Sequence, residues 1–384
     1  MMNDEFSSIG EIVKILKGSK APEVFDKPRP GAYPYLQIED LRPDATPKYA
    51  IDKDGTLATK ADVLIAWDGA NAGTIGFDLE GYIGSTIAIL RPTRDDIHAP
   101  YLGYFLRSKF EDIQDNTTGA TIPHVSRDYL ENLKIPLPPL TEQKRIASLL
   151  ARADRLRQLR RTAHDLGDAL LQSVFLEMFG DLTVNQKNWD LLFLEDIADV
   201  HGGIQVTSTR NSMRLQKPYL RVANVYRNQL ELSEIKMIGL TQSEFERTKL
   251  QKDDLLFVEG HGNINEIGRA AVWDGSIEDC VHQNHLICAR LDLNLANSVF
   301  VSTYVNSPAG KSYFTNISNT TSGLNTISTN TVKSCPIPLP PLSLQAEFAG
   351  VVARVESLRG RMSEAGRQVE GLFESLLSES FGGK

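Results

Sequence analysis

The chain has 384 residues, of which 41% are hydrophobic and 23% charged, so it has the length of two or three domains and the composition of a globular protein. This composition excludes collagen-like and intrinsically disordered chains. The net charge of -8 at pH 7 argues against binding nucleic acid by simple charge attraction, because neutralisation of phosphates by Lys and Arg normally supplies much of that affinity.

The N-terminal residues do not have the pattern of a secretion signal. The sequence Met1-Met-Asn-Asp-Glu-Phe-Ser-Ser is acidic and polar, where a secretion signal needs positive charge followed by an apolar stretch. No run approaches the roughly eighteen apolar residues of a membrane span. The three cysteines, Cys280, Cys288 and Cys335, form no C-x-x-C pair. We therefore expect a reduced, cytoplasmic protein that holds no structural zinc or other metal.

Residues 1–140 are predicted to form a mixed, β-rich domain with a few helices. Short β-branched and apolar runs, such as Asp62-Val-Leu-Ile-Ala-Trp and Thr86-Ile-Ala-Ile-Leu, alternate with Gly, Asn and Pro. The domain ends in the proline cluster Ile135-Pro-Leu-Pro-Pro-Leu, which is expected to act as a stiff hinge.

Residues 141–181 are predicted to be a helical spacer, because Pro and Gly are nearly absent and apolar residues recur at helical spacing. Thr141 is the expected N-cap. Between Lys144 and Arg161 the helix carries a run of Lys and Arg residues against Asp154 alone. This run is a local exception to the acidic balance, and it fits a nucleic-acid contact as well as a solvated helix face or a partner contact.

Residues 182–342 repeat the pattern of the first domain. The proline hexapeptide recurs as Ile337-Pro-Leu-Pro-Pro-Leu, about half the chain length downstream of its first copy. Neighbouring stretches match in the same order: Tyr33-Pro-Tyr-Leu resembles Lys217-Pro-Tyr-Leu, and Lys60-Ala-Asp-Val-Leu-Ile resembles Lys252-Asp-Asp-Leu-Leu-Phe. A coincidental hexapeptide would not bring its neighbours with it, so the pattern indicates an internal duplication.

Residues 343–384 are predicted to be a second helical spacer, with Ser343 as the expected N-cap. Apolar residues here follow steps of four and three without a break, as in a coiled coil, and the equivalent stripe of the first helix is weaker at Arg160 and Gly167. Neither stripe could be buried alone, so we expect the two helices to pack on each other, in a direction that the pattern leaves open. The residues expected at this seam or against a partner are Leu149, Leu156, Leu170, Val351, Val355, Leu358, Met362, Val369 and Leu372.

These motifs resemble the specificity subunit of type I restriction-modification systems over nearly the whole chain. Leu133-Lys-Ile-Pro-Leu-Pro-Pro-Leu-Thr-Glu-Gln-Lys-Arg-Ile is similar to the proline-to-helix signature of that family. The second copy keeps Gln345 but has Leu344 where the first has Glu142. The resemblance implies an α+β fold in which two target-recognition domains are separated by two long helices that form a coiled-coil spacer, all related by a pseudo-two-fold internal repeat.

The resemblance also implies a function. In that family each recognition domain reads one half of a split double-stranded DNA target, and the helices set the spacing between the halves. The helices also dock two copies of an adenine methyltransferase subunit, and a restriction subunit can join. The two domains differ in sequence, so the target is expected to be asymmetric. The chain itself is expected to hold no cofactor, because S-adenosylmethionine would be bound by the partner.

We expect no catalytic residue in this chain. It lacks the Asn/Asp-Pro-Pro-aromatic motif of amino-methyltransferases, and it has no Walker A loop for a translocating motor. His282 and His285 beside Cys280 and Cys288 could suggest a metal cluster. However, this segment alternates like a strand and its spacings fit no zinc pattern, so no metal site is predicted there.

DNA contacts are expected from polar loops at residues 116–126 and 319–328, because hydroxyl and amide groups suit base edges and phosphates alike. The alternative interpretation is that both loops are ordinary polar turns. The residues expected to contact DNA are Lys17, Lys20, Arg29, Thr117, Thr118, Thr121, His124 and Ser126 in the first domain, and Arg210, Arg221, Arg227, Thr320, Thr321, Asn325 and Ser328 in the second.

Two further classes of function compete with this hypothesis. One is an enzyme that carries out methyl transfer or cleavage alone, and the absent motifs count against it. The other is a repeat scaffold that binds only proteins through its coiled coil. Methyl transfer by the isolated chain would favour the first, and DNA binding that stays indifferent to sequence even with the methyltransferase present would favour the second.

Overall fold

The computed structural model describes residues 5–42, 46–119, 121–321 and 324–381, and the chain divides into two compact units. The first unit comprises residues 1–162 and 362–384, and the second comprises residues 163–361. Each unit combines one β-rich domain with part of each long helix, α5 (Leu140–Phe179) and α11 (Leu342–Phe381). The four-segment division made from the sequence stays a prediction.

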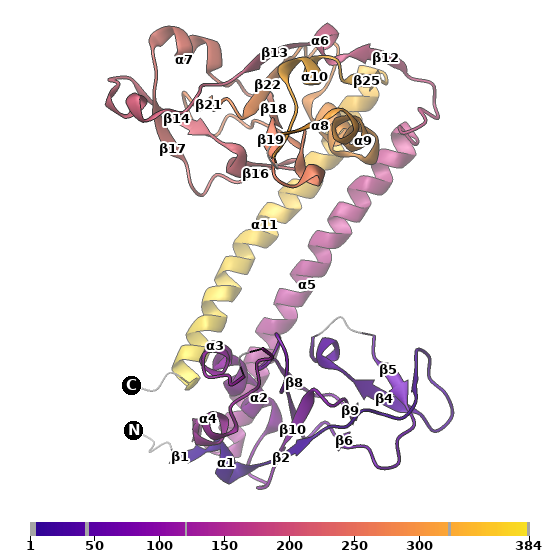
Figure 1. Ribbon diagram of the computed structural model, residues 1–384, viewed down its shortest axis with the longest axis vertical. Helices are drawn as coiled ribbons and strands as arrows, with labels where there is room; N and C mark the ends of the chain where they lie inside the picture. The colour runs from indigo at the N-terminus through magenta and orange to yellow at the C-terminus, as the bar shows by residue number, and fades with distance from the viewer. Residues whose placement is uncertain (1–4, 43–45, 120, 322–323, 382–384) are drawn as a thin grey trace. The chain divides into compact units, whose positions relative to one another are not determined.

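The first unit contains eleven strands and four shorter helices among its described residues (Figure 1). In chain order these are β1 (Glu5–Ser8), α1 (Ile9–Ile12), β2 (Val13–Lys17), β3 (Val24–Phe25), β4 (Tyr33–Leu36), β5 (Lys48–Ala50), β6 (Leu57–Ala58), β7 (Val63–Ala66), β8 (Ile75–Phe77), β9 (Gly81–Ile83), β10 (Ile87–Pro92), α2 (Ala99–Ser108), α3 (Phe110–Asp115), α4 (Arg127–Asn132) and β11 (Lys134–Leu137).

The second unit follows a similar order with additional short strands. Its elements are β12 (Asp190–Phe193), α6 (Leu194–Ile197), β13 (Ala198–Gly202), β14 (Gln216–Leu220), β15 (Val225–Tyr226), β16 (Gln229–Leu230), β17 (Lys236–Gly239), α7 (Gln242–Thr248), β18 (Leu255–Val258), β19 (Gly260–His261), β20 (Ala270–Val272), β21 (Val281–His282), β22 (Leu286–Leu291), α8 (Ser298–Asn306), α9 (Pro308–Ile317), β23 (Asn319–Thr321), β24 (Leu324–Thr326), α10 (Thr329–Lys333) and β25 (Pro336–Leu339).

Both units are built around the same four-stranded antiparallel sheet, with the order β2-β10-β7-β8 in the first and β13-β22-β18-β20 in the second. The central strands β7 and β18 are buried along their whole length, because both faces of each sheet are covered. One face packs on α2 or α8, and the other face packs on a second sheet. A strand buried on both faces is apolar throughout, as Val63-Leu-Ile-Ala and Leu255-Leu-Phe-Val are.

The units differ in the sheet that covers the second face. In the first unit this sheet has five strands in the order β3-β5-β4-β9-β6, whereas in the second it has three in the order β17-β14-β21. The framework is therefore repeated while the added strands and loops are not. The α+β fold with a duplicated domain, predicted from the proline clusters and their neighbours, is confirmed.

Within the first unit, α5 and α11 pack antiparallel. Arg157 forms an ion pair with Glu370 and lies with its Cζ 4.4 Å from the ring centroid of Phe373, whereas Arg160, further along α5, lies against Gly366. The end of α11 reaches the domain, where the Phe381 ring centroid lies 5.2 Å from that of Tyr101. Later positions of α5 thus contact earlier positions of α11, which means that the two helices run in opposite directions.

The second unit has the same arrangement. The Arg359 guanidinium donates to the carboxylate of Asp168 at 2.6 Å and to the carbonyl of His164 at 3.1 Å, while Phe348 packs on Phe175 near the end of α5. The direction left open by the sequence pattern is therefore antiparallel within each unit. In the described part of the chain, no helix is both long enough and apolar enough to cross a membrane.

At Arg160 and Gly167, where the apolar stripe of α5 is interrupted, an arginine on one helix faces a glycine on the other. In the first unit a Cβ added at Gly366 would overlap the guanidinium of Arg160, and in the second a Cβ at Gly167 would lie 2.8 Å from a guanidinium nitrogen of Arg359. Glycine on one helix thus makes room for the long side chain of arginine on the other. The apolar seam is interrupted when either helix is considered alone, but the arginine of one helix fits the glycine of the other when the two helices pack.

The predicted seam residues differ in burial. Val355 is buried, and Leu149, Val351, Met362 and Val369 are partly buried. Four leucines of the set remain about half exposed, namely Leu156 (47%), Leu170 (50%), Leu358 (52%) and Leu372 (57%). Part of the apolar stripe thus packs within the units, and part of it faces outward.

A buried glutamine fixes the start of each long helix to its domain. The helices begin at Leu140 and Leu342, so the carbonyls of Pro139 and Pro341 accept the first helical hydrogen bonds, and the predicted N-caps Thr141 and Ser343 lie inside the first turn. The Gln345 carbonyl accepts from the Asn297 backbone N–H at 2.8 Å, and its amide donates to the carbonyl of Pro340 at 2.7 Å. Gln143 makes equivalent bonds to His98 and Pro138.

Replacing Gln345 by leucine should lower the free energy of unfolding of the second unit by about 2–4 kcal/mol, because two backbone groups would lose their partners inside the protein. Urea denaturation followed by circular dichroism measures this change. The matched control is Glu347→Gln, an exposed position two residues further along the helix, which should have little effect. Equal stability of both variants would contradict the assigned role of Gln345.

Candidate nucleic-acid interface

In the first domain, the predicted polar loop meets the Gly- and Asn-rich turn that follows β7. The backbone N–H of Gly69 donates to the carbonyl of Pro123, and that of Val125 donates to the carbonyl of Trp67, both at 2.9 Å. Asp68 and His124 form an isolated antiparallel bridge. Gly69 has φ +98°, in the left-handed region that favours glycine, and a Cβ there would meet nothing within 4 Å. Two motifs far apart in sequence thus form one surface.

A small charged cluster lies at this junction. The Nδ1 atom of His124 lies 2.6 Å from a carboxylate oxygen of Asp68, and the Lys17 ammonium lies 4.0 Å from the same oxygen. Lys17 also lies 5.0 Å from the ring centroid of Trp67. The Asp68 contact makes Nδ1 the donor of the imidazole and leaves Nε2 for an outside partner. The side chains of Lys17 and His124 are 54% and 46% exposed, so both are accessible to a ligand.

The other residues of this loop that are predicted to contact DNA fall into two groups, those whose side chains are hydrogen-bonded within the protein and those whose side chains are exposed. Thr118 and Thr121 are exposed. The Thr117 hydroxyl donates to the carbonyl of Gln114 at 2.9 Å, and the Ser126 hydroxyl accepts from the backbone N–H of Tyr129 at 3.3 Å as the N-cap of α4. Thr117 and Ser126 therefore have structural partners already, whereas the exposed side chains of Thr118 and Thr121 can meet an outside group.

The second domain joins its two motifs by short strands. β19 pairs with β24, which also pairs with β23, so His261 lies opposite Asn325. The Asn325 amide donates to the carbonyls of His261 at 3.3 Å and Gly262 at 3.2 Å, and the residue is only 7% exposed. Asn325 thus holds the two loops together from inside. The Ser328 hydroxyl accepts from the backbone N–H of Thr331 at 3.1 Å, which makes it the N-cap of α10.

The side chains of Thr320 and Thr321 lie outside what the structure describes. One pair at this junction was missed from the sequence: the Nδ1 atom of His285 lies 3.0 Å from a carboxylate oxygen of Glu259. This pair resembles that of Asp68 and His124 in one respect, since in each domain a carboxylate just after the central strand contacts an exposed imidazole. The positions are not equivalent in the repeat, because Glu259 corresponds to Trp67 and His285 to Thr86. Comparing the turns after the two apolar strands would have suggested the carboxylates, but only the fold reveals which histidine each one meets.

Two predicted cations of the first domain lie on the five-stranded sheet. Lys20 lines a shallow hollow together with Tyr35, Gln37 and Lys48. The guanidinium carbon of Arg29 lies 4.1 Å from the ring centroid of Phe25. Both side chains are exposed, and they come from different elements than the loop junction at Lys17 and His124.

The three predicted arginines of the second domain have acidic partners. Arg210 donates twice to the carboxylate of Glu244, at 2.7 and 3.0 Å, and these bonds hold the pKa of Glu244 at about 2, well below its usual range. Arg221 pairs with Glu234 at 2.5 Å. Arg227 lies 3.8 Å from Glu266. Any role of these arginines at a phosphate would have to compete with the carboxylates.

The basic run on α5 is a further source of free charge in the first unit. Within it, Arg145 is paired with Glu142 and Arg157 with Glu370. The remaining exposed cations have no ion-pair partner among the described residues; these are Lys144, Arg152, Arg155 and Arg161. Unpaired exposed cations on one helix can attract phosphate or an acidic protein surface.

A family model matches most of the chain. A model for the type I restriction modification DNA specificity domain matches residues 2–164 and 186–359. The specificity subunit of the type I restriction enzyme MjaVIII from Methanocaldococcus jannaschii is 31% identical over 212 residues, which cover 52% of this chain and 50% of that relative. The EcoKI specificity subunit from Escherichia coli is 27% identical over 368 residues, covering 86% of this chain and 76% of that relative. The match thus spans half the length of the archaeal relative and more of the bacterial one.

Solved structures agree on the fold. The S subunit of a type I restriction-modification system from M. genitalium superposes with a TM-score of 0.65 at 15% identity, covering 99% of this chain and 97% of that chain. A chain from work on complex assembly and conformational transition of the type I R-M system has a TM-score of 0.51 at 19% identity, covering 98% and 97%. At these identities the likeness concerns the fold alone.

Proposed function

This chain belongs to the type I restriction-modification DNA specificity family, and we propose that it is the DNA-reading, non-catalytic subunit of such a system. Each of its two domains reads one half of a split, asymmetric double-stranded DNA target. Its helices set the distance between the halves and dock two methyltransferase subunits, which bind S-adenosylmethionine and methylate adenine. The same recognition directs restriction when a restriction subunit joins the complex.

The observation that carries this proposal is the repeated loop junction. The same place in both sheets, after β7 and after β18, meets the loop that precedes the last short helix of its domain. The framework bonds are alike, but the accessible side chains differ, with Lys17, Thr118 and His124 in one domain and the exposed His285 and the partly buried His261 in the other. Two surfaces that share a backbone framework but carry different polar side chains are suited to reading two different half-sites.

Charge has to be reconciled with DNA binding in an acidic chain. The three predicted arginines of the second domain are paired with carboxylates, whereas the first unit has exposed cations without an ion-pair partner among the described residues, four of them on α5. Base reading by the loops then depends on phosphate contacts from elsewhere, and we assign part of these to the methyltransferase partner. DNA affinity of the isolated chain should accordingly be much weaker than that of the complex.

Docking of the partner is assigned to the outward-facing leucines. In the first unit these are Leu156, Leu159 and Leu372, with exposed fractions of 47%, 50% and 57%. In the second unit they are Leu166, Leu170 and Leu358, at 64%, 50% and 52%. Each unit thus offers its own apolar side chains, which fits one partner per unit and two per chain.

Replacing Leu156, Leu159 and Leu372 together by glutamine should weaken binding of one methyltransferase by about 2–4 kcal/mol, or roughly 30-fold or more, because their exposed area would no longer be buried in the interface. Isothermal titration of the purified partner into the chain should then give about one tight site instead of two. Ser148→Ala, at an exposed polar position of the same helix, is the control. Two unchanged sites in the triple variant would contradict the assignment.

The experiment that tests the function is a genome-wide map of adenine methylation in cells that express this chain with its methyltransferase, compared with cells that lack the chain. The expected result is a split, asymmetric motif that depends on the chain, with halves about one DNA helical turn apart. If no motif appears while the partner is bound, sequence-directed methylation is wrong and a protein scaffold becomes the better hypothesis.

A further inference from the structure

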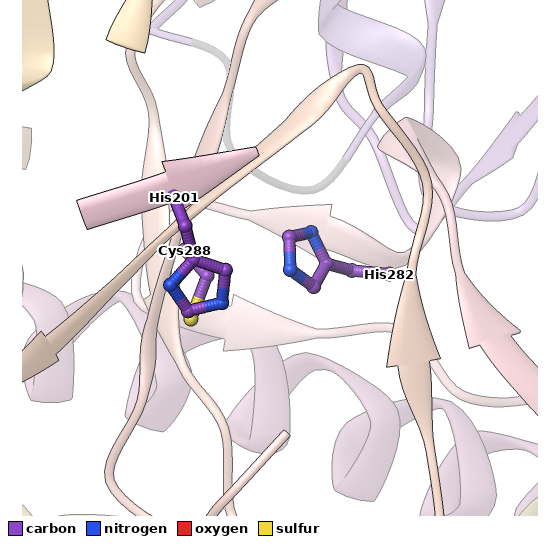
Figure 2. Close-up of side chains that lie close together, drawn as sticks. All are labelled: His201, His282 and Cys288. Carbon is purple, nitrogen blue, oxygen red and sulfur yellow. The ribbon is translucent and has the colours of Figure 1, made fainter. Parts of the chain in front are cut away.

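Three side chains from three strands of the second domain meet at a buried point. His201 of β13, His282 of β21 and Cys288 of β22 place their nitrogen and sulfur atoms within 4.8 Å of one another. Figure 2 shows the ring of His282 pointing toward the other two side chains. His282 and Cys288 are fully buried, and the side chain of His201 is 17% exposed. The cluster lies where the four-stranded sheet faces the smaller sheet of that domain.

Both imidazoles carry an unused nitrogen. The Nε2 atoms of His201 and His282 are buried and have no hydrogen-bond partner among the described residues. A buried polar atom without a partner is unfavourable by about 1–3 kcal/mol, so two of them side by side call for an explanation.

The other nitrogen of each ring is already oriented. Nδ1 of His282 lies 3.0 Å from the backbone carbonyl of Leu286, which can only accept, so Nδ1 carries the proton and Nε2 has a free lone pair. Nδ1 of His201 lies 3.7 Å from a carboxylate oxygen of Asp199. A backbone carbonyl or a carboxylate at the far nitrogen is the arrangement that orients metal-binding histidines.

The first domain supplies an internal reference for these positions. His201 pairs with Cys288 across β13 and β22 in the register in which Leu16 pairs with Ile89 across β2 and β10. His282 lies opposite Leu220 as Ile83 lies opposite Leu36. The equivalents of the three residues are therefore Leu16, Ile83 and Ile89, and these pack in an apolar cluster.

Comparing the two domains shows which side chains the sheet requires for stability and which are particular to the second domain. The sheet is stable with leucine and isoleucine at these positions, since the first domain has them there. The second domain replaces all three with the two side-chain types that bind transition metals most readily, and it does so at positions that touch one another. A structural role alone would not require any of the three replacements.

We propose that His201, His282 and Cys288 form a binding site for a thiophilic transition-metal ion, with zinc as the expected occupant. Zinc bonds to imidazole nitrogen at about 2.0–2.1 Å and to thiolate sulfur at about 2.3 Å, so the three atoms would close in by roughly an ångström around the ion. The ion would displace the proton of the Cys288 thiol. It would join β13, β21 and β22, and so tie the smaller sheet to the four-stranded sheet.

The grouping was not visible in the sequence. Cys280 and His285 share the segment with His282 and Cys288, but the fold takes both away from the cluster. The Cys280 thiol lies 3.6 Å from the carbonyl of Val281, and His285 pairs with Glu259. The third ligand is instead His201, which comes from a strand far upstream.

The test uses the full chain, purified without chelators, and measures its metal content by mass spectrometry. We expect about one zinc ion per chain, and at least roughly tenfold less in the triple variant His201→Leu, His282→Ile and Cys288→Ile. These substitutions restore the side chains that the first domain buries at the same positions, so the variant is expected to fold, which circular dichroism checks. Cys335→Ala removes a buried thiol outside the cluster and should retain the metal.

Cobalt loading of the unmodified chain gives a second readout that does not depend on the folding of any variant. Cobalt bound through Cys288 should give a thiolate-to-metal charge-transfer band in the near ultraviolet, and zinc should abolish that band by competition. Absence of this band, or equal metal content in the native chain and the triple variant, would overturn the proposal.

Discussion

Replacing Phe348 by alanine should lower the free energy of unfolding of the second unit by about 3–5 kcal/mol, because it removes a fully buried ring and leaves a cavity. The Phe348 ring centroid lies 5.2 Å from that of Phe175 and 5.6 Å from that of Phe179, which in turn lies 4.7 Å from that of Phe300. These rings come from α11, α5 and α8. One substitution thus loosens both long helices from the domain they carry.

Hydrogen exchange of the backbone amides is the suitable measurement, because it resolves the two units separately. Exchange should accelerate in α8 and in the end of α5, while the core of the first unit stays protected. Trp189 gives a local optical signal, since its indole N–H donates to the carbonyl of Phe179 at 2.9 Å. Leu358→Ala, half exposed on the same helix, is the control and should change stability by less than about 1 kcal/mol. Similar effects at both positions would argue against a central role of the ring cluster.

The sequence predicted the architecture well because duplication is recorded at many positions at once. The proline hexapeptides, the matching strands and the 4,3 spacing each indicate the same two domains and two helices. Because the chain is duplicated, each half also serves as a related sequence with which the other half can be compared. The starts of the helices were predicted within one residue, since proline limits what can precede a helix.

Side-chain partnerships were less predictable, because they depend on strand register and on where loops cross. Asn325 is predicted from its loop to meet DNA, yet the loop crosses β19 and the side chain bonds to carbonyls inside. Arg210 looks like a free cation in sequence, but the fold brings Glu244 to it. The contacts of both residues with DNA stay predictions. His201 has no neighbour in sequence that would suggest a cluster, and only the pairing of β13 with β22 places it beside Cys288.

Removing the exposed polar side chains of the first loop should relax one half of the methylated motif and leave the other half unchanged. The variant is Thr118→Ala, Thr121→Ala and His124→Ala. Each hydrogen bond to a base that these substitutions remove should reduce discrimination at that base pair by about 1–3 kcal/mol, or roughly 5- to 150-fold. The backbone bonds between Thr118 and His124 do not depend on these side chains, and Asp68 keeps Lys17 nearby, so the loop should retain its shape.

The methylation map of cells expressing each variant is the measurement. Thr320→Ala with Thr321→Ala makes the corresponding change in the second loop, and it should relax the opposite half of the motif. The control is Thr93→Ala, an exposed threonine just after β10, at the opposite end of that strand from the loop junction. If both loop variants relaxed the same half, the two domains would not read separate half-sites. If neither changed the motif while the control also left it intact, the bases would be read by other surfaces, and Lys20 and Arg29 on the five-stranded sheet would be the next candidates in the first domain.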